Sequence, residues 1–264
     1  MRFCPQCGEE RLRPTDLSLR DLTAQIIKDA ISIDGKLVRS WRILLTRPGQ
    51  LTAAHISGER RRYITPLALF FIANAAFVSV QALTGTNILS TPLDAHLHGQ
   101  DWSPLVQSLV GDRLAARDLT LEAYAPVFDR SAQFNAKALI ILMALAFAPL
   151  PALVFRDRHR PAGAHIVFAL HLYAFILVLL SAAVLLAQLD IAFGGLGLRS
   201  GVVDKLLSVF NLLVCGGYIY LAVLRIYAAS GAWKLASTIV LTSAVALLFV
   251  GYRIAIFLIT FYMT

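Results

Sequence analysis

The sequence has few charged residues and few cysteines, and each shortage excludes a class of protein. Only 15% of the 264 residues are charged, whereas 58% are hydrophobic and the mean hydropathy is +0.68. A chain this apolar falls outside the range of ordinary soluble domains and needs lipid as its solvent. Three cysteines are too few for the disulfide framework of a small secreted domain.

The apolar stretches also lack internal carboxylates, and the chain lacks common hydrolase motifs. Asp190 and Asp204 lie at the ends of apolar stretches and not inside them. Ionisable groups inside a membrane mark proton pathways and intramembrane active sites. Their absence argues against a proton-coupled antiporter or a carboxylate-dependent intramembrane protease, and no H-E-x-x-H motif is present. The sequence therefore favours a non-enzymatic protein.

Long apolar stretches dominate what the chain does contain. About 20 helical residues are needed to cross about 30 Å of hydrocarbon. Five stretches meet this length, at residues 64–83, 137–155, 165–189, 202–227 and 235–263. We expect an all-α polytopic membrane protein with five transmembrane helices at 64–264, an outer polar loop at about 84–136, and cytoplasmic amphipathic helices at 15–63.

Basic residues before the first apolar stretch predict the orientation. A single acid, Glu59, lies among them. The cations are Lys36, Arg39, Arg42, Arg47, Arg60, Arg61 and Arg62. Cytoplasmic flanks of spans are enriched in Lys and Arg, and a second basic segment, R-D-R-H-R at 156–160, follows the second stretch. We expect a multi-pass membrane protein with its N-terminus in the cytoplasm, its C-terminus outside, and a first span that acts as an uncleaved signal.

Residues 36–48 predict an amphipathic helix at the membrane surface. Its apolar face consists of Leu37, Val38, Trp41, Leu44 and Leu45, and its basic face of Lys36, Arg39 and Arg42. Pro48 and Gly49 end the helix. The apolar face fits either lipid or the transmembrane helices, because a hydrophobic stripe does not identify its partner. Anionic lipid is the expected partner of the net charge of +8, and nucleic acid is not, because the basic residues cluster at membrane borders.

Residues 1–14 contain one C-x-x-C motif, formed by Cys4 and Cys7. With proline between the cysteines and glycine after them, the motif predicts a knuckle that points two thiolates at one metal ion. A structural zinc site needs four ligands, and only two are visible. Two interpretations stay open: a zinc site completed by outside ligands or across a dimer, and a reduced knuckle without metal.

The polar segment after the first span contains D-A-H-L-H-G-Q-D. Its candidate ligands for a transition metal are Asp94, His96, His98 and Asp101. Two histidines at i and i+2 project the same way from an extended backbone. The alternative is a solvated polar loop. Further on, residues 112–128 predict one short amphipathic helix that Pro126 ends.

Two arginines in apolar stretches are candidate contacts for a lipid phosphate or a small anion. Arg253 lies inside the fifth stretch and Arg225 near the end of the fourth. Each could instead extend to the membrane surface. Arg60, Arg61 and Arg62 are further candidate lipid contacts. Two histidines of the third stretch, His165 and His171, are candidates for polar contacts inside the membrane. They point to different faces of one helix, which favours hydrogen bonds between helices over a shared metal.

Several short motifs occur in a familiar order. They are C-P-x-C-G, D-G-K-L, L-L-T-R-P-G, I-S-G-E-R-R-R-Y-I-T-P-L and H-I-V-F-A-L-H-L-Y-A-F. Together they resemble a family of uncharacterised bacterial membrane proteins with an N-terminal zinc-ribbon-like knuckle, over residues 3 to about 175. Members typically carry two C-x-x-C knuckles, whereas this chain has one. The resemblance implies a membrane architecture, a location in the bacterial inner membrane and no particular activity.

The sequence therefore predicts a scaffold or adaptor that organises lipid or recruits a protein partner, including a second copy of itself, through its cytoplasmic head. The competing prediction is a transporter or channel subunit for a lipid or small anion, with Arg253 and Arg225 as contacts. A metal enzyme that uses His96 and His98 is the third and least supported interpretation.

Overall fold

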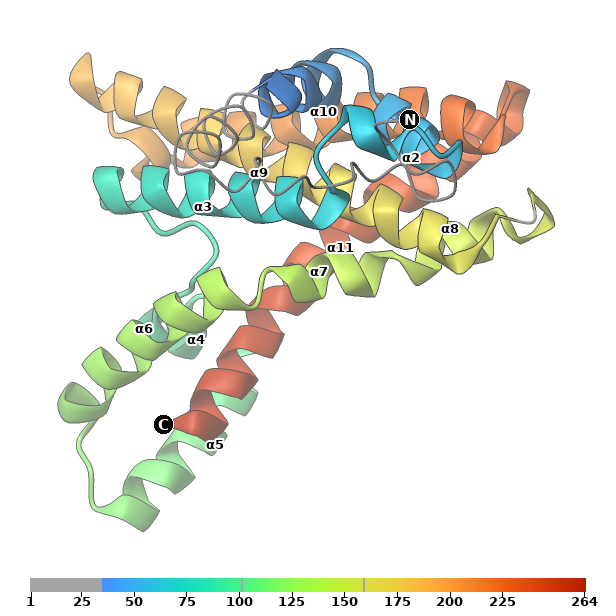
Figure 1. Cartoon of the computed structure of the whole chain (residues 1–264). Coiled ribbons are helices and arrows are strands. Elements are labelled where there is room, and N and C mark those ends of the chain that lie inside the picture. Colours follow the sequence, from blue (N-terminus) through green and yellow to red (C-terminus); the bar gives the residue numbers. More distant parts are fainter. Residues whose placement is uncertain (1–34, 101, 159) are drawn as a thin grey trace, which may run out of the picture.

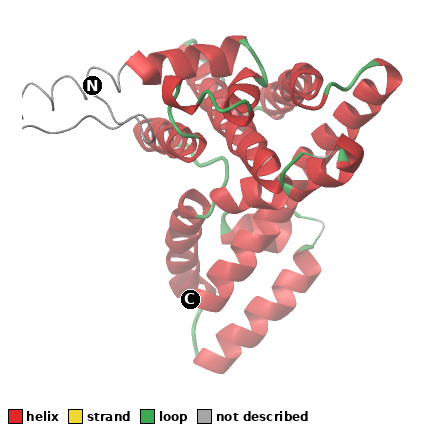
Figure 2. Ribbon diagram, turned by 45° about the vertical axis from the view of Figure 1, so that its right-hand side comes forward, coloured by secondary structure: helices red, strands yellow, loops and turns green. Residues whose placement is uncertain are grey.

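A computed structural model describes residues 35–100, 102–158 and 160–264. Every regular element in these ranges is helical, and Figure 2 shows no strand among them. The predicted all-α polytopic class is confirmed. The predicted knuckle at 1–14 and the amphipathic helix expected at about 15–33 lie outside the described residues.

The helices follow one another with short connections (Figure 1). The first covers residues 35–46. The others are α2 (Gln50–Ile56), α3 (Pro66–Thr84), α4 (Leu93–His98), α5 (Ser103–Arg117), α6 (Leu121–Ala138), α7 (Ile141–Phe147), α8 (Pro149–Val154), α9 (Ala162–Ala192), α10 (Gly201–Tyr227) and α11 (Gly231–Met263), with 3-10 turns η2 (Arg60–Arg62), η3 (Arg156–Arg158) and η4 (Gly197–Arg199).

Four helices, α3, α9, α10 and α11, are long and apolar enough to cross a membrane. They correspond to the first, third, fourth and fifth predicted spans. The second differs, because Lys137 belongs to α6 and the chain bends by 53° between α6 and residues 141–154. Those fourteen residues extend only about 21 Å as a helix. The described chain therefore has five spans only if this bent pair counts as one.

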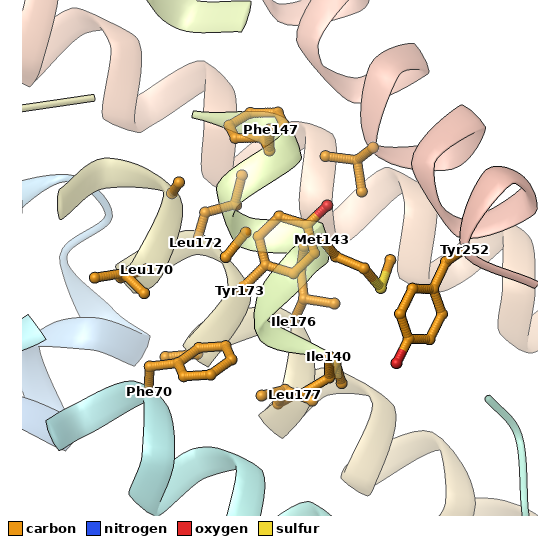
Figure 3. Close-up of a cluster of buried hydrophobic side chains, with 14 of the residues drawn as sticks. Phe70, Ile140, Met143, Phe147, Leu170, Leu172, Tyr173, Ile176, Leu177 and Tyr252 are labelled. Atoms are coloured by element: carbon orange, nitrogen blue, oxygen red, sulfur yellow. The ribbon is translucent and has the colours of Figure 1, made fainter. Parts of the chain in front are cut away.

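Helix α9 lies at the centre of the bundle. It packs against α3, α7, α10 and α2, and in Figure 1 it runs beside α3. Figure 3 shows Met143 of α7 between Tyr173 of α9 and Tyr252 of α11. The Phe147 ring meets Tyr173 edge to face at 6.0 Å. Because lipid tails are as apolar as these side chains, such close packing and a few polar contacts hold membrane helices together.

Helices α4, α5 and α6 form a lobe with the C-terminal half of α11, set to one side of the bundle (Figures 1 and 2). Tyr252 donates a hydrogen bond from its hydroxyl to the Ala136 carbonyl at 2.7 Å, and Asn135 donates to Thr260 at 3.0 Å. The segment expected to be an outer polar loop is thus largely helical in its described residues.

Two local predictions in this lobe are wrong. The single helix expected at 112–128 is divided, since Asp118 takes a left-handed conformation (φ 50°) after α5 and Thr120 caps α6 by accepting from the Ala123 amide. Pro126 does not end a helix but lies inside α6. In the second turn, a proline removes only one backbone hydrogen bond.

Candidate functional site

The first candidate site is a basic segment, residues 35–62, which we name the docked segment. Its helix at 35–46 buries Leu44 and Ser40 against the bundle, and Trp41 packs partly against the same core. The Ser40 hydroxyl accepts a hydrogen bond from the Ile64 amide at 3.1 Å. The sequence left lipid and the transmembrane helices open as partners of the apolar face, and the transmembrane helices cover one part of it.

The other part of that face is exposed. Val38 has 68% of its surface exposed and Leu45 has 46%. At 100° per residue these two side chains lie on one edge of the helix, next to exposed Arg42 and Arg39. An apolar edge beside cations is the pattern of a helix that lies in a membrane interface.

Pro48 and Gly49 fix the segment to α10. Both residues are buried, and Gly49 has φ 78°, in the left-handed region. A Cβ at Gly49 would lie 2.8 Å from Cα of Ala222, so no side chain fits there. Arg225 donates a hydrogen bond from Nη1 to the Pro48 carbonyl at 2.6 Å. Arg225, predicted as an anion contact, thus holds the docked segment in place.

Helix α2 continues the attachment on α9 and α10. The Thr52 hydroxyl and His171 Nδ1 lie 2.9 Å apart, and both side chains are buried. On α9, the helix that also contains His171, His165 Nδ1 lies 2.8 Å from the Tyr227 hydroxyl of α10. The prediction that His165 and His171 bond between helices and do not share a metal is consistent with these separate partners.

The docked segment presents exposed cations. Lys36 is half-buried, and Arg39, Arg42, Arg47, Arg61 and Arg62 are exposed. Within the described ranges, the ion pairs join other residues, Asp94 to His98 and Arg156 to Asp157. Arg62 lies 5.9 Å over the ring of Tyr63. Unpaired cations on a fixed backbone attract anionic headgroups.

A second basic segment lies at the same end of the bundle. Arg156, Arg158 and Arg160 directly precede α9, whose first turns contact Tyr227 at the end of α10. Phe155 stacks on that tyrosine with ring centroids 4.2 Å apart. The basic flanks on which the predicted orientation depends therefore lie at one end of the helices.

The second candidate site is a cleft of about 420 Å³ between α9, α10 and α11, which we name the Arg253 cleft. Its walls are mainly apolar, and its polar side chains are Arg253, Asp204, Ser208 and Asn211. Arg253 is exposed and, in the described part of the chain, makes no ion pair or hydrogen bond. A concave apolar site with a few polar groups is the usual form of a ligand site.

A second cavity of about 620 Å³, which we name the mouth, adjoins this cleft and shares Ile88, Leu198 and Asp204 with it. Thr86 and Gln188 line the mouth, joined by a 3.0 Å hydrogen bond. Arg199 adds a second exposed cation. The two cavities adjoin at these shared residues, and polar atoms make up a larger share of the lining in the mouth than in the cleft.

The structure separates the predicted metal ligands around His96. Residues 93–98 form α4 and not an extended strand, so the i, i+2 histidines point to different sides. His98 is exposed and lies 3.1 Å from the carboxylate of Asp94. Asp101 lies outside the described residues. The geometry expected for a shared metal site is therefore wrong for His96 and His98.

His96 packs inside the lobe. It is 2% exposed, accepts a hydrogen bond from Trp102 Nε1 at 3.2 Å, and its ring lies 4.9 Å from that of Phe257. Burial, with a smaller contribution from the positive charge of Arg253, lowers its pKa to about 4. His96 is therefore neutral near pH 7, and Nδ1 accepts, so Nε2 carries the proton.

The described residues contain no cluster of three or more His, Cys, Asp or Glu side chains that could hold a metal ion. The predicted zinc ligands Cys4 and Cys7 lie outside those residues. Cys215 is a free, buried thiol of α10.

The sequence did not point to Ser40, Thr52 or the Pro48 carbonyl as contacts. A proline followed by glycine, as at Pro48 and Gly49, indicates a turn, but this pattern does not show that the turn packs against α10. Their partners are 24 to 177 positions away along the chain.

Part of the chain matches a known protein family. The family described as "Protein of unknown function (DUF3667)" matches residues 34–78. These residues comprise the docked segment and most of α3. No curated protein matches the chain, and no solved structure matches it.

Proposed function

We propose that this protein is a non-enzymatic scaffold of the bacterial inner membrane that gathers anionic phospholipid headgroups at the cytoplasmic surface through the docked segment. The cytoplasmic N-terminal residues then recruit a protein partner or a second copy of the chain. The observation that carries the proposal is a set of exposed arginines that form no ion pair with the described residues, on a backbone fixed to the transmembrane bundle.

Rigid attachment supports this role. The contacts of Gly49 and Pro48 with α10, and of Thr52 with His171, hold the arginines before any lipid arrives. A site ordered in advance loses less conformational entropy when it binds. Each Lys or Arg near an anionic surface contributes about 1 kcal/mol to that attraction.

The apolar edge of the helix at 35–46 supports the membrane surface as the partner. Val38 and Leu45 are exposed beside Arg42. A water-facing surface for soluble anions would not need these apolar side chains, whereas a helix at a bilayer surface buries them among the upper acyl carbons.

A lipid-enrichment experiment tests the proposal. The full-length protein is placed in nanodiscs with equal amounts of phosphatidylglycerol and phosphatidylcholine, and the lipid kept nearest the protein is quantified. We expect enrichment of phosphatidylglycerol that falls about fivefold for each arginine removed in Arg39→Gln/Arg42→Gln. High salt should weaken it because exposed charges are screened.

The matched control is Arg130→Gln/Lys205→Gln, which removes two exposed cations far from the docked segment. It should leave the enrichment unchanged. Equal losses in both double variants would show that net charge alone attracts the lipid, which rejects a role for the docked segment.

A transporter or channel subunit is the second candidate, and the Arg253 cleft favours it. Cys215 and Ile176 line the cleft, and next to them Phe175 stacks on Tyr218 with ring centroids 4.1 Å apart. This packing of α9 against α10 beside the cleft favours binding over conduction. Ion flux through vesicles that contain the pure protein would support the channel and count against the scaffold.

Zinc on Cys4 and Cys7 is a separate part of the proposal. Two thiolates from each of two copies would supply the four ligands that a structural zinc ion needs. Metal analysis of the pure protein should then find one zinc ion per two chains, lost in Cys4→Ser. If the purified protein contains no zinc, the proposal of a zinc site on Cys4 and Cys7 is wrong.

A further inference from the structure

The Arg253 cleft has the length and shape of a lipid-chain site. Along α10 its lining extends from Asp204 to Cys215. These residues are eleven positions apart, a helical rise of about 16 Å, which is about half of the roughly 30 Å hydrocarbon core of a bilayer. The cleft therefore has about the depth of one leaflet. Near the Cys215 end of the cleft, Phe175 of α9 stacks on Tyr218 of α10.

The lining is more polar in the mouth than in the cleft. Leu180 and Ala183 of α9 and Ala246 of α11 line the cleft, whereas Thr86 and Gln188 line the mouth. A small polar solute would make no favourable contact with the apolar walls of the cleft, and a hydrocarbon would make none with the polar side chains of the mouth. An amphiphile with one acyl chain in the cleft and its headgroup in the mouth matches both.

Opposite charges face this site without neutralising each other. Arg253 and Asp204 both line the cleft, and within the described ranges neither side chain takes part in an ion pair or hydrogen bond. Arg199 lines the mouth beside Asp204. Two cations can bind a phosphate by charge-assisted hydrogen bonds. A purely anionic headgroup would place its negative charge near Asp204, whereas a headgroup with an ammonium group would pair with that carboxylate.

We propose that the Arg253 cleft binds an aminophospholipid such as phosphatidylethanolamine, with one acyl chain between α9, α10 and α11, its phosphate on Arg253 and its ammonium group on Asp204. The site lies at the opposite end of the bundle from the docked segment and shares no residue with it. The inference therefore goes beyond the proposed scaffold role, and either can fail without the other.

Native mass spectrometry of the full-length protein in detergent tests this site. The probes are phosphatidylethanolamine, phosphatidylcholine and phosphatidylglycerol with identical acyl chains. We expect phosphatidylethanolamine to bind most tightly, and Arg253→Gln to weaken it about tenfold, since hydrogen bonds to charged groups are stronger than neutral ones. In Asp204→Asn the preference over phosphatidylcholine should disappear, because a quaternary ammonium group cannot donate hydrogen bonds.

Two further variants test the chain-binding part. Ala246→Phe adds a ring to the wall of the cleft and should reduce binding of all three lipids. Ala236→Phe makes the same change at an exposed position of α11 outside the cleft and should not. Thermal unfolding of each variant shows whether the protein still folds.

Unchanged lipid binding in both Arg253→Gln and Ala246→Phe would overturn the site. Tighter binding of phosphatidylglycerol than of phosphatidylethanolamine by the unaltered protein would overturn the headgroup assignment. Neither result depends on the arginines at positions 39 and 42, whose removal should leave this binding unaffected.

Discussion

The contact between Gly49 and α10 makes the most specific prediction about the docked segment. In Gly49→Ala the new methyl group would lie 2.8 Å from Cα of Ala222, closer than two carbon atoms pack. A left-handed conformation costs a non-glycine residue about 1 kcal/mol, and overpacking of a tight interface costs about 1–3 kcal/mol more. We therefore expect Gly49→Ala to destabilise the protein by about 2–4 kcal/mol.

Gly85→Ala is the matched control for this prediction. Gly85 has a similar conformation (φ 65°), but no atom lies within 4 Å of the position of its Cβ. Gly85→Ala should therefore lower the free energy of unfolding only by the cost of the left-handed conformation, about 1 kcal/mol. Reversible unfolding in mixed detergent micelles gives both values, and hydrogen exchange of the amides in α2 shows whether the segment detaches. Equal losses for the two variants, with α2 still protected, would refute close docking on α10.

Three further predictions concern buried polar contacts. A double-mutant cycle of Thr52→Val and His171→Phe should give a coupling of about 0.6 kcal/mol in unfolding free energy, the average for hydrogen bonds within membranes, and a coupling of zero would mean the pair is not bonded. Arg225→Gln shortens the side chain that reaches the Pro48 carbonyl, so hydrogen exchange at residues 48–56 should become faster while the rest of α10 stays protected. The pKa of His96 is lowered to about 4 in the fold, so the unfolded chain binds the proton first as pH falls from about 6.5. The free energy of unfolding should therefore decrease by up to about 1.4 kcal/mol per pH unit down to pH 4. The same measurement on His96→Gln should show a weaker dependence of the unfolding free energy on pH.

The sequence was sufficient to predict the main spans because a long apolar stretch has few other possible environments. Helices α3, α9, α10 and α11 follow four such stretches. The second stretch, at 137–155, is equally apolar, but its first residues extend α6, a helix that begins in a polar sequence. Hydropathy averages over a window and does not detect a bend of 53°.

The polar contacts between helices could not be predicted from the sequence. A threonine in a helix has the same local pattern whether it bonds to its own backbone or, like Thr52, to a histidine 119 positions away. Arg225 illustrates the difficulty, because an arginine near a span end suits a membrane surface as well as the Pro48 carbonyl. The pair His96 and His98 shows the same limit, because two residues at i and i+2 point the same way from an extended backbone but to different sides of a helix such as α4.

The central claim, that one edge of the helix at 35–46 lies on lipid, can be tested with two neighbouring labels. Leu45→Cys and Thr46→Cys, each in a chain whose native cysteines are replaced by serine, are coupled to a fluorophore in vesicles that contain phosphatidylglycerol. Both positions are exposed, but they point about 100° apart on the helix. The label at position 45 should be quenched by a lipid-borne quencher and that at position 46 by an aqueous one. Aqueous quenching of both labels would contradict the claim.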